Sequence, residues 1–328
     1  MQAPLPASPV ARRLAPRFGF DPDRLVRLDA IENEVLAAEG ALGQGILRVM
    51  EPGHRSLDEV RAELDWLQAL AAAALPVARP LPSRDGAYLV TDGDPPWVGV
   101  AFERAPGRHL APDEWTPALF RAHGALVGRL QAHARSWTPS GPRRRPWLDL
   151  YSLSRAREAF ADDTVCLEAV AEVGLHVARV VPQDEADVGL VHGDLHAWNV
   201  LVDDAGGLTA IDFDDAVVGP YLYDLVIPLC DAVTTRHAQE PGVVADAFLG
   251  PYLVGFDAVA PRPAGGAAAV AALLALRQAD LAIFVQLVVS VERMDPEPRS
   301  AAKRLRDAIA RRDEVVPLAV LRRHFGDA

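Results

Sequence analysis

Lysine is almost absent from this chain of 328 residues: of its 33 lysine and arginine residues, only Lys303 is a lysine. Any cation that binds a phosphate in the N-terminal part of the chain must therefore be an arginine. Acidic residues are in excess, and the formal net charge is −12. This balance argues against a nucleic-acid-binding protein, which would need a basic face.

Cysteine and long apolar runs are also scarce. Cys166 and Cys230 have neither a metal-ligand nor a redox spacing, so we expect two buried thiols. The apolar stretches 267–276 and 281–291 are separated by Arg277 and Asp280, and each is shorter than the roughly 20 residues that span a membrane. The N-terminus has no basic start followed by an apolar run, which predicts a cytoplasmic chain without a membrane partner.

The pattern of the chain changes near residue 105, from mixed strands and helix to mainly helix. We therefore expect an extension over residues 1–24, an N-terminal lobe over 25–105 and a C-terminal lobe over 106–328. The chain is half hydrophobic and long enough for two such lobes. The predicted fold class is α+β.

The N-terminal lobe is predicted to be a small antiparallel sheet with one crossing helix. The helix, from Leu57 to about Ala74, has apolar residues at three- and four-residue steps and begins with a capping box at Ser56–Glu59. The strands are predicted at Leu25–Leu28, Asn33–Ala38, Gly45–Val49, Ala87–Thr91 and Trp97–Glu103.

The C-terminal lobe is predicted to hold short strands between two sets of helices. A turn at Asp203–Gly207 allows the second and third strands to form a hairpin. Helices are expected near Thr116–Trp137, Leu153–Ala161 and Val165–Val181 and again from Pro220 onward, and strands at Leu190–His192, Val200–Val202 and Leu208–Asp212.

Three polar residues around these strands have the chemistry of phosphoryl transfer. Asp194 and Asn199 share a loop between two strands, and the hairpin returns with Asp212 thirteen residues later. Magnesium prefers oxygen ligands, and a separate carboxylate must accept the hydrogen bond of the attacking hydroxyl. We assign Asp194 as the catalytic base and Asn199 and Asp212 as ligands of Mg²⁺.

The motifs at His192–Leu201 (HGDLHAWNVL) and Ile211–Leu225 (IDFDDAVVGPYLYDL) resemble the aminoglycoside phosphotransferase superfamily. The paired aspartates and the Gly-Pro that follows are similar to its stress-response kinase A and homoserine-kinase-like branches. The resemblance implies a bilobed protein-kinase-like fold with ATP between the lobes. We expect His192 to orient the loop and Asp224 to anchor it.

The resemblance also implies residues that bind the nucleotide. A cation on the third strand holds the α- and β-phosphates and pairs with a helix glutamate; the matching residues are Arg48, which replaces the usual lysine, and Glu63. The hinge backbone near Glu103 and Ala105 meets the adenine.

These observations predict transfer of the γ-phosphoryl group of ATP to a hydroxyl of a small molecule, such as an aminoglycoside, homoserine, choline or a sugar. The paired-aspartate branch also suggests a protein serine/threonine kinase. Asp214 and Asp215 are open to three interpretations: a second Mg²⁺ site, a site for a cationic substrate, or solvated residues. Acceptor-binding acids are expected after residue 225, where the candidates are Asp231, Asp280, Glu292 and Asp295.

Two rival functions come from other classes. His192-x-Asp194-x-His196 contains residue types that bind zinc or iron in a metallohydrolase. Arg48, together with a glycine-free loop at residues 29–33, is compatible with an inactive nucleotide-binding partner protein.

Overall fold

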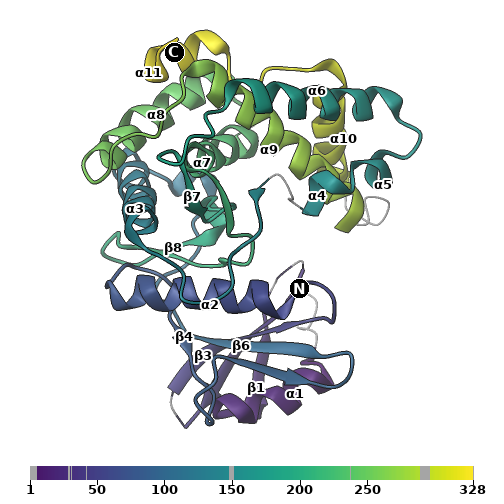
Figure 1. The fold of residues 1–328 in the computed structure, drawn as a ribbon, viewed down its shortest axis with the longest axis vertical. Helices are drawn as coiled ribbons and strands as arrows, with labels where there is room; N and C mark the ends of the chain where they lie inside the picture. The colour runs from purple at the N-terminus through teal and green to yellow at the C-terminus, as the bar shows by residue number, and fades with distance from the viewer. Residues whose placement is uncertain are drawn as a thin grey trace. The chain divides into compact units, whose positions relative to one another are not determined.

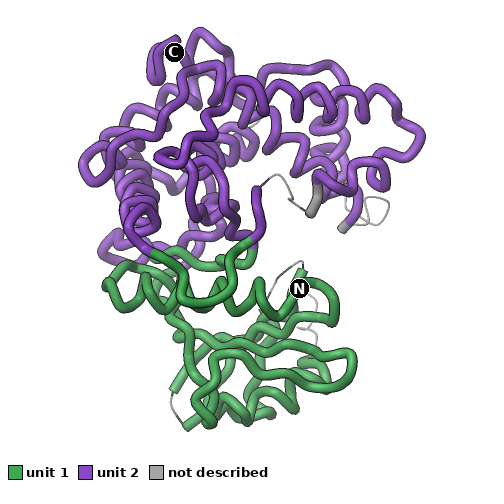
Figure 2. Tube along the Cα trace, in the orientation of Figure 1, with its two compact units in different colours: residues 1–107, 138–144, 209–214 green, residues 108–137, 145–208, 215–328 purple. Residues whose placement is uncertain are grey.

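The computed structural model describes residues 6–28, 30, 32–41, 43–147, 151–236, 238–288 and 296–327. The chain forms two compact units (Figure 2). Unit 1 comprises residues 1–107, 138–144 and 209–214, and unit 2 comprises residues 108–137, 145–208 and 215–328. The segment 209–214, which carries Asp212, belongs to unit 1, although in the sequence it follows residues 145–208 of unit 2.

Unit 1 is built on an antiparallel sheet, of which Figure 1 labels β1, β3, β4 and β6. The order of strands is β1-β2-β3-β6-β4, with β5 paired to β6. The predicted strands are confirmed, with β6 at its predicted bounds, and the short β4 was not predicted. The strands are β1 Phe20–Arg27, β2 Glu34–Gly40, β3 Gly43–Met50, β4 Pro80–Leu81, β5 Leu89–Asp92 and β6 Trp97–Glu103.

The crossing helix of unit 1, α2 (Leu57–Ala72), is also confirmed. Its capping box is formed as expected: Glu59 N donates to Ser56 Oγ at 3.2 Å, and Ser56 N donates to Glu59 Oε2 at 2.9 Å. The helix ends two residues before the predicted end. Its buried face includes Val60, Leu64 and Leu67, which are on the three- and four-residue steps of the sequence pattern.

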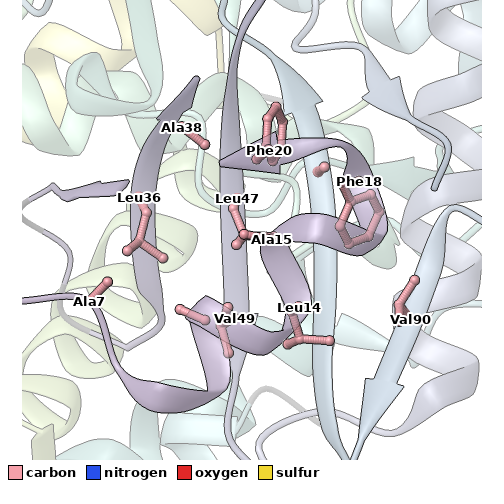
Figure 3. Packing of buried hydrophobic residues seen from close by; sticks show 12 residues of the cluster. Ala7, Leu14, Ala15, Phe18, Phe20, Leu36, Ala38, Leu47, Val49 and Val90 are labelled. Atoms are coloured by element: carbon pink, nitrogen blue, oxygen red, sulfur yellow. The ribbon is translucent and has the colours of Figure 1, made fainter. Parts of the chain in front are cut away.

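The segment before residue 25 corrects the expected extension, because it belongs to the core of unit 1. It forms α1 (Pro9–Leu14), the 3₁₀ helix η1 (Ala15–Phe18) and the first part of β1. Leu14 and Phe18 pack on Leu47 of β3 and its neighbours in one hydrophobic cluster (Figure 3). The sequence signal for α1 was Ser8 followed by Pro9, an N-cap and first-turn pair: Ser8 Oγ accepts from Ala11 N at 3.1 Å.

Unit 2 is mainly helical, as predicted, with two small pairs of strands. β7 pairs with β10 in antiparallel register, and β8 pairs with β9 to give the predicted hairpin. The predicted helix at 153–161 is two short helices. The elements are η2 Pro112–Glu114, α3 Pro117–Ser136, α4 Tyr151–Ser154, α5 Ala156–Phe160, α6 Thr164–Val180, β7 Val188–Val191, η4 Ala197–Asn199, β8 Val200–Val202, β9 Leu208–Ala210, β10 Val217–Pro220, α7 Tyr221–Thr235, α8 Pro241–Asp257, α9 Ala267–Val288, α10 Pro296–Arg311 and α11 Leu318–Phe325.

Helices α3 and α8 approach each other closely at two glycines. A Cβ on Gly124 would lie 1.9 Å from the Tyr252 carbonyl oxygen, and a Cβ on Gly255 would lie 1.8 Å from that of Arg121. Only glycine allows this backbone contact. The pair supports the helical layer around α7, which carries residues that hold the loop between β7 and β8.

Helix α9 contains both apolar stretches of the sequence. By length and composition, Ala267–Leu287 could cross a membrane, but 67% of its most apolar window is buried within the protein. The helix packs against α6, α7, α10 and α11, as expected for a core helix. Cys166 and Cys230 are both buried free thiols, which confirms their predicted burial.

Candidate active site

The loop after β7 is held in place through its backbone. Asp224, on α7, accepts hydrogen bonds from His192 N at 2.7 Å and from Gly193 N at 2.9 Å. His192 is fully buried, and its Nδ1 accepts from Asp194 N at 3.3 Å. Gly193 has a φ of +80°, and a Cβ there would lie 2.4 Å from the Asp215 carbonyl oxygen. The sequence-based roles of His192 and Asp224 in orienting and anchoring the loop agree with these contacts.

The carboxylate of Asp194 is contacted on both oxygens. Oδ2 accepts from Asn199 Nδ2 at 3.0 Å and lies 3.2 Å from His196 Nε2, while Oδ1 accepts from Arg277. Trp198 N donates to His196 Nδ1 at 3.1 Å, so the proton of a neutral His196 is on Nε2, facing Asp194. The side chain of Asp194 retains 18% exposure, which leaves room for an acceptor.

Charge around Asp194 fixes its ionisation. Burial alone would raise the Asp194 pKa, but the charges of Arg277 and His196 outweigh it and lower the pKa well below its usual range. Burial alone would lower the His196 pKa, but the Asp194 carboxylate outweighs it and raises the pKa. Asp194 is therefore a carboxylate at neutral pH, the form that accepts a hydrogen bond from a hydroxyl.

Asn199 ends η4 and is buried beside Asp194. Its amide nitrogen donates to both the carbonyl oxygen of Asp194, at 2.8 Å, and the carboxylate, at 3.0 Å. The nitrogen is thereby committed to Asp194, and the side-chain oxygen is the atom that can serve as a metal ligand.

In unit 1, Arg48 and Glu63 form the ion pair that the resemblance implied. Nη2 of Arg48 donates to both carboxylate oxygens of Glu63, at 2.9 and 2.7 Å, and both side chains are buried. The pairing follows from strand alternation: Leu47 and Val49 face the cluster under α1, so Arg48 between them faces the opposite side. Burial alone would lower the Arg48 pKa, but the charges of Glu63, Asp214 and Asp212 outweigh it and raise the pKa.

Asp212 follows β9 in a strained conformation. Its φ is +60°, in the left-handed region that a non-glycine residue rarely adopts. Its Oδ1 lies 3.6 Å from Nη1 of Arg48, and its side chain is 53% exposed. A carboxylate that is half exposed and directed by a strained backbone is suited to bind a metal ion.

Asp214 is not solvated, which removes one of the three interpretations of this residue. It is buried, with His54 Nε2 at 3.2 Å, Arg55 Nε at 3.4 Å and Asn33 Nδ2 at 3.3 Å from its carboxylate. Burial alone would raise the Asp214 pKa, but His54, Arg48 and Arg55 lower it well below its usual range. Because cationic side chains already offset the negative charge of this carboxylate, a second Mg²⁺ is not expected there.

The arrangement around His192 and His196 does not support the metallohydrolase. Within the described part of the chain, the ligand atoms close enough to share a metal ion belong to Glu32, His54 and Asp214, not to the two loop histidines. In this group, the Asp214 carboxylate already accepts a hydrogen bond from Arg55. Asp29 and Ile31 of the glycine-free loop lie outside the described residues, as do the acceptor candidates Glu292 and Asp295.

The two hinge candidates lie at and just after the end of β6. Glu103 is the last residue of β6, is exposed, and its backbone nitrogen donates to Arg79 O at 2.8 Å. Ala105 lies two residues later and is half-buried. Nothing in their surroundings tests the adenine contact, which stays a prediction.

A pocket in unit 2 opens beside the Asp194 loop. Its volume is about 360 Å³, including space open to solvent, and its walls include Ala197 and Trp198 of η4. Trp115 and Phe248 supply apolar surface, and Asp231 supplies a carboxylate whose Oδ2 accepts from Ala197 N at 3.2 Å. The pocket thus combines apolar walls with an acid attached to the loop of the proposed base.

Sequence reasoning missed Arg277, which contacts Asp194 and also donates to Asp280 at 3.1 Å. A signal for it was present, because Arg277 and Asp280 are the charges that interrupt the apolar stretches of α9. A buried charge in an apolar helix is costly unless it has a specific partner. The sequence could not show which partner that is.

The fold is that of the kinase-like phosphotransferases. The chain belongs to the phosphotransferase enzyme family (APH), whose model matches residues 24–262. This membership, predicted from the two motifs, is confirmed, and with it the bilobed kinase-like fold.

Individual relatives agree with the family. The chain is 31% identical over 225 residues to an amicoumacin kinase from Bacillus subtilis. The aligned region covers 67% of this chain and 66% of that kinase, so the chain spans just under two thirds of the kinase's length. An amicoumacin kinase solved with AMP-PNP, Ca²⁺ and Ami has a TM-score of 0.85 at 23% identity, covering 94% of each chain. A microcompartment-associated aminopropanol kinase has a TM-score of 0.73 at 24% identity, covering 92% of this chain and 94% of that one.

Proposed function

We propose that the protein transfers the γ-phosphoryl group of ATP to a hydroxyl of a small molecule that also carries an amine. The observation that carries the proposal is the ionised, partly exposed Asp194 in a loop whose backbone is fixed by Asp224. Such a carboxylate can accept the hydrogen bond of an attacking hydroxyl and take up its proton as the new oxygen–phosphorus bond forms. The bond from the γ-phosphorus to the leaving ADP oxygen breaks in the same transfer.

The residues of unit 1 are suited to the nucleotide. Arg48 is oriented by Glu63 and keeps Nη1 for a second partner, with Asp212 at 3.6 Å. An arginine fork can contact two phosphate oxygens at once. We assign Arg48 to the phosphates, Glu63 to its orientation and the backbone at Glu103 and Ala105 to the base of the nucleotide.

Asn199 and Asp212 are the proposed ligands of a divalent cation. Both offer oxygen donors, one an amide and the other a half-exposed carboxylate, and this donor set fits Mg²⁺. When bound, the cation neutralises charge on the phosphate oxygens. A related structure that contains AMP-PNP and Ca²⁺ supports the use of a nucleotide with a divalent cation.

An acidic group near the acceptor side supports an amine in the substrate. Asp231 borders the pocket beside the loop, and burial raises its pKa above the usual range. Asp280, buried in the same unit, already pairs with Arg277, so Asp231 is the carboxylate available to an amine. Carboxylates that lack enough counter-charge are favourable partners for an ammonium group. Relatives named as aminopropanol and choline kinases act on amino alcohols or their quaternary analogue, consistent with this class.

The test is phosphate transfer from γ-labelled ATP in the presence of Mg²⁺. Amino alcohols and aminoglycosides, neutral polyols of similar size, and a generic protein substrate are offered in parallel, with Asp194→Ala as the control. We expect label on an amine-bearing compound with the wild type only. Label on protein would instead identify a protein serine/threonine kinase, and label on neutral polyols alone would refute the amine. A protein that neither binds ATP nor transfers phosphate would refute the proposal. The cytoplasmic location stays a prediction.

A further inference from the structure

Arg277 joins the proposed catalytic base to a helix far away in the sequence. It lies on α9, 83 residues after Asp194, and its Nη2 donates to Oδ1 of Asp194. Its Nη1 donates to Oδ2 of Asp280, three residues further along α9, at 3.1 Å. The side chain of Arg277 is only 9% exposed. One guanidinium therefore bridges a carboxylate of the catalytic loop and a carboxylate of a core helix.

This bridge differs from a surface ion pair because of where its ends are attached. α9 packs against α4, α5, α6, α7, α10 and α11 of unit 2, so Arg277 starts from a rigid support. The guanidinium is planar, and with one nitrogen committed to Asp280 its other nitrogen is aimed in a fixed direction. Desolvation of an arginine is costly, and the charge of Asp194 is the largest favourable contribution that offsets it.

The contacts divide the two oxygens of Asp194 between different elements. Oδ1 is held by Arg277 from α9, and Oδ2 by Asn199 and His196 from the catalytic loop itself. Contacts from the loop alone would let the carboxylate turn or shift together with the loop. The contact from Arg277 on α9 comes from outside the loop, and it therefore limits rotation of the Asp194 carboxylate.

We propose that Arg277 is a positioning residue, which clamps the Asp194 carboxylate against α9 so that it meets the acceptor hydroxyl in one orientation, with Asp280 holding the clamp. This inference rests on the proposed function. Arg277 acts through Asp194 rather than on the nucleotide, because its contacts are with Asp194 and Asp280 in unit 2. Loss of the clamp should therefore reduce the rate of transfer and leave the KM for ATP unchanged.

The first test is Arg277→Lys, which keeps the charge but cannot bridge two carboxylates with a planar fork. We expect kcat for transfer to fall by roughly 10- to 100-fold, since a misplacement of about 1 Å can cost on the order of 100-fold. The KM for ATP should stay within about twofold of the wild type. Arg262→Lys is the control: Arg262 is an exposed arginine that pairs through two nitrogens, at 2.7 and 2.6 Å, with the carboxylate of Asp257.

Two further measurements separate positioning from a general structural role. In an Asp194→Asn background, Arg277→Lys should cause no further loss of kcat, because the carboxylate that it orients is gone. In Arg277→Ala, millimolar guanidinium should restore part of kcat, whereas ammonium at the same concentration should not. ATP binding by each variant reports whether it is folded; if Arg277→Ala does not fold, Arg277→Lys and the double variant decide.

Three results would overturn the inference: an unchanged kcat in Arg277→Lys, an equal loss in the wild-type and Asp194→Asn backgrounds, or a rise in the KM for ATP that accounts for the whole effect. Each presupposes a wild-type protein that transfers phosphate. Failure of the wild type to transfer phosphate to any acceptor would refute the proposed function itself, and is distinguished in this way from failure of the clamp.

Discussion

The buried pair between Arg48 and Glu63 makes it possible to separate stability from nucleotide binding. Their side chains are 5% and 0% exposed, so Arg48→Met leaves the buried Glu63 carboxylate without its hydrogen-bonded cation. Breaking a buried ion pair in this way costs about 3–5 kcal/mol in the free energy of unfolding. At about 2–4 °C per kcal/mol for domains of moderate size, the Tm should fall by roughly 10 °C.

The double variant Arg48→Met/Glu63→Leu removes both charges and leaves apolar side chains of similar size. Replacement of a whole buried pair by apolar residues is often neutral, so most of the lost Tm should return. The kcat/KM for ATP should remain low, because neither residue can then contact or orient a phosphate. Stability and activity are thus expected to change in different ways across the same two variants.

The measurements are thermal unfolding by circular dichroism at pH 7 and steady-state kinetics with ATP as the varied substrate. Arg61→Met is the control on the same helix, since Arg61 pairs with Asp58 at 2.8 Å where the side chains are 53% and 69% exposed. An exposed pair contributes about 0–1 kcal/mol. A Tm for Arg48→Met equal to that of this control would refute the energetic reasoning. Full kcat/KM in the double variant would refute the phosphate-binding role.

Three other predictions concern the base, the metal and pH. Asp194→Ala should lower kcat by about 10²–10⁴-fold while calorimetry shows retained ATP binding; an equal loss in the exposed Asp184→Ala would contradict a specific role. Chelation with EDTA should abolish transfer, and Asp212→Asn should raise the Mg²⁺ concentration needed for half-maximal rate; an unchanged Mg²⁺ requirement would exclude Asp212 as a ligand. The Asp280 pKa is raised by burial from 3.8 to about 7, so the folded state binds this proton more tightly than the unfolded chain. Its contribution to stability is present below about pH 4 and lost as pH rises to about 7, so the Tm of the wild type should fall across this window more steeply than that of Asp280→Asn; parallel curves would contradict the raised pKa.

Most of the regular structure could be predicted because it depends on local patterns. The capping box at Ser56–Glu59 and the apolar steps of α2 specify that helix without reference to the rest of the chain. Strand β6 was placed at its observed bounds by its run of apolar residues. In contrast, β4 has two residues and takes part in the sheet only through its pairing with β6. A segment so short has no periodicity to detect.

The N-terminal segment shows a second limit. Ser8 and Pro9 mark the start of α1, but the helix has only six residues. Isolated helices of this length are unstable in water, so α1 depends on packing of Leu14 against the sheet (Figure 3). Its membership of unit 1 could not be read from composition.

The sequence by itself determined the family, and it predicted the reaction class and the candidate residues Asp194, Asn199 and Asp212, because those residues lie in short motifs whose spacing reflects the chemistry. Only the tertiary structure decided how their charges are managed. It pairs Arg48 with Glu63 across a strand and a helix, surrounds Asp214 with cations, and brings Arg277 to Asp194 from 83 residues away. Burial and long-range ion pairs depend on which surfaces pack together, and a linear pattern of residues does not encode that choice directly.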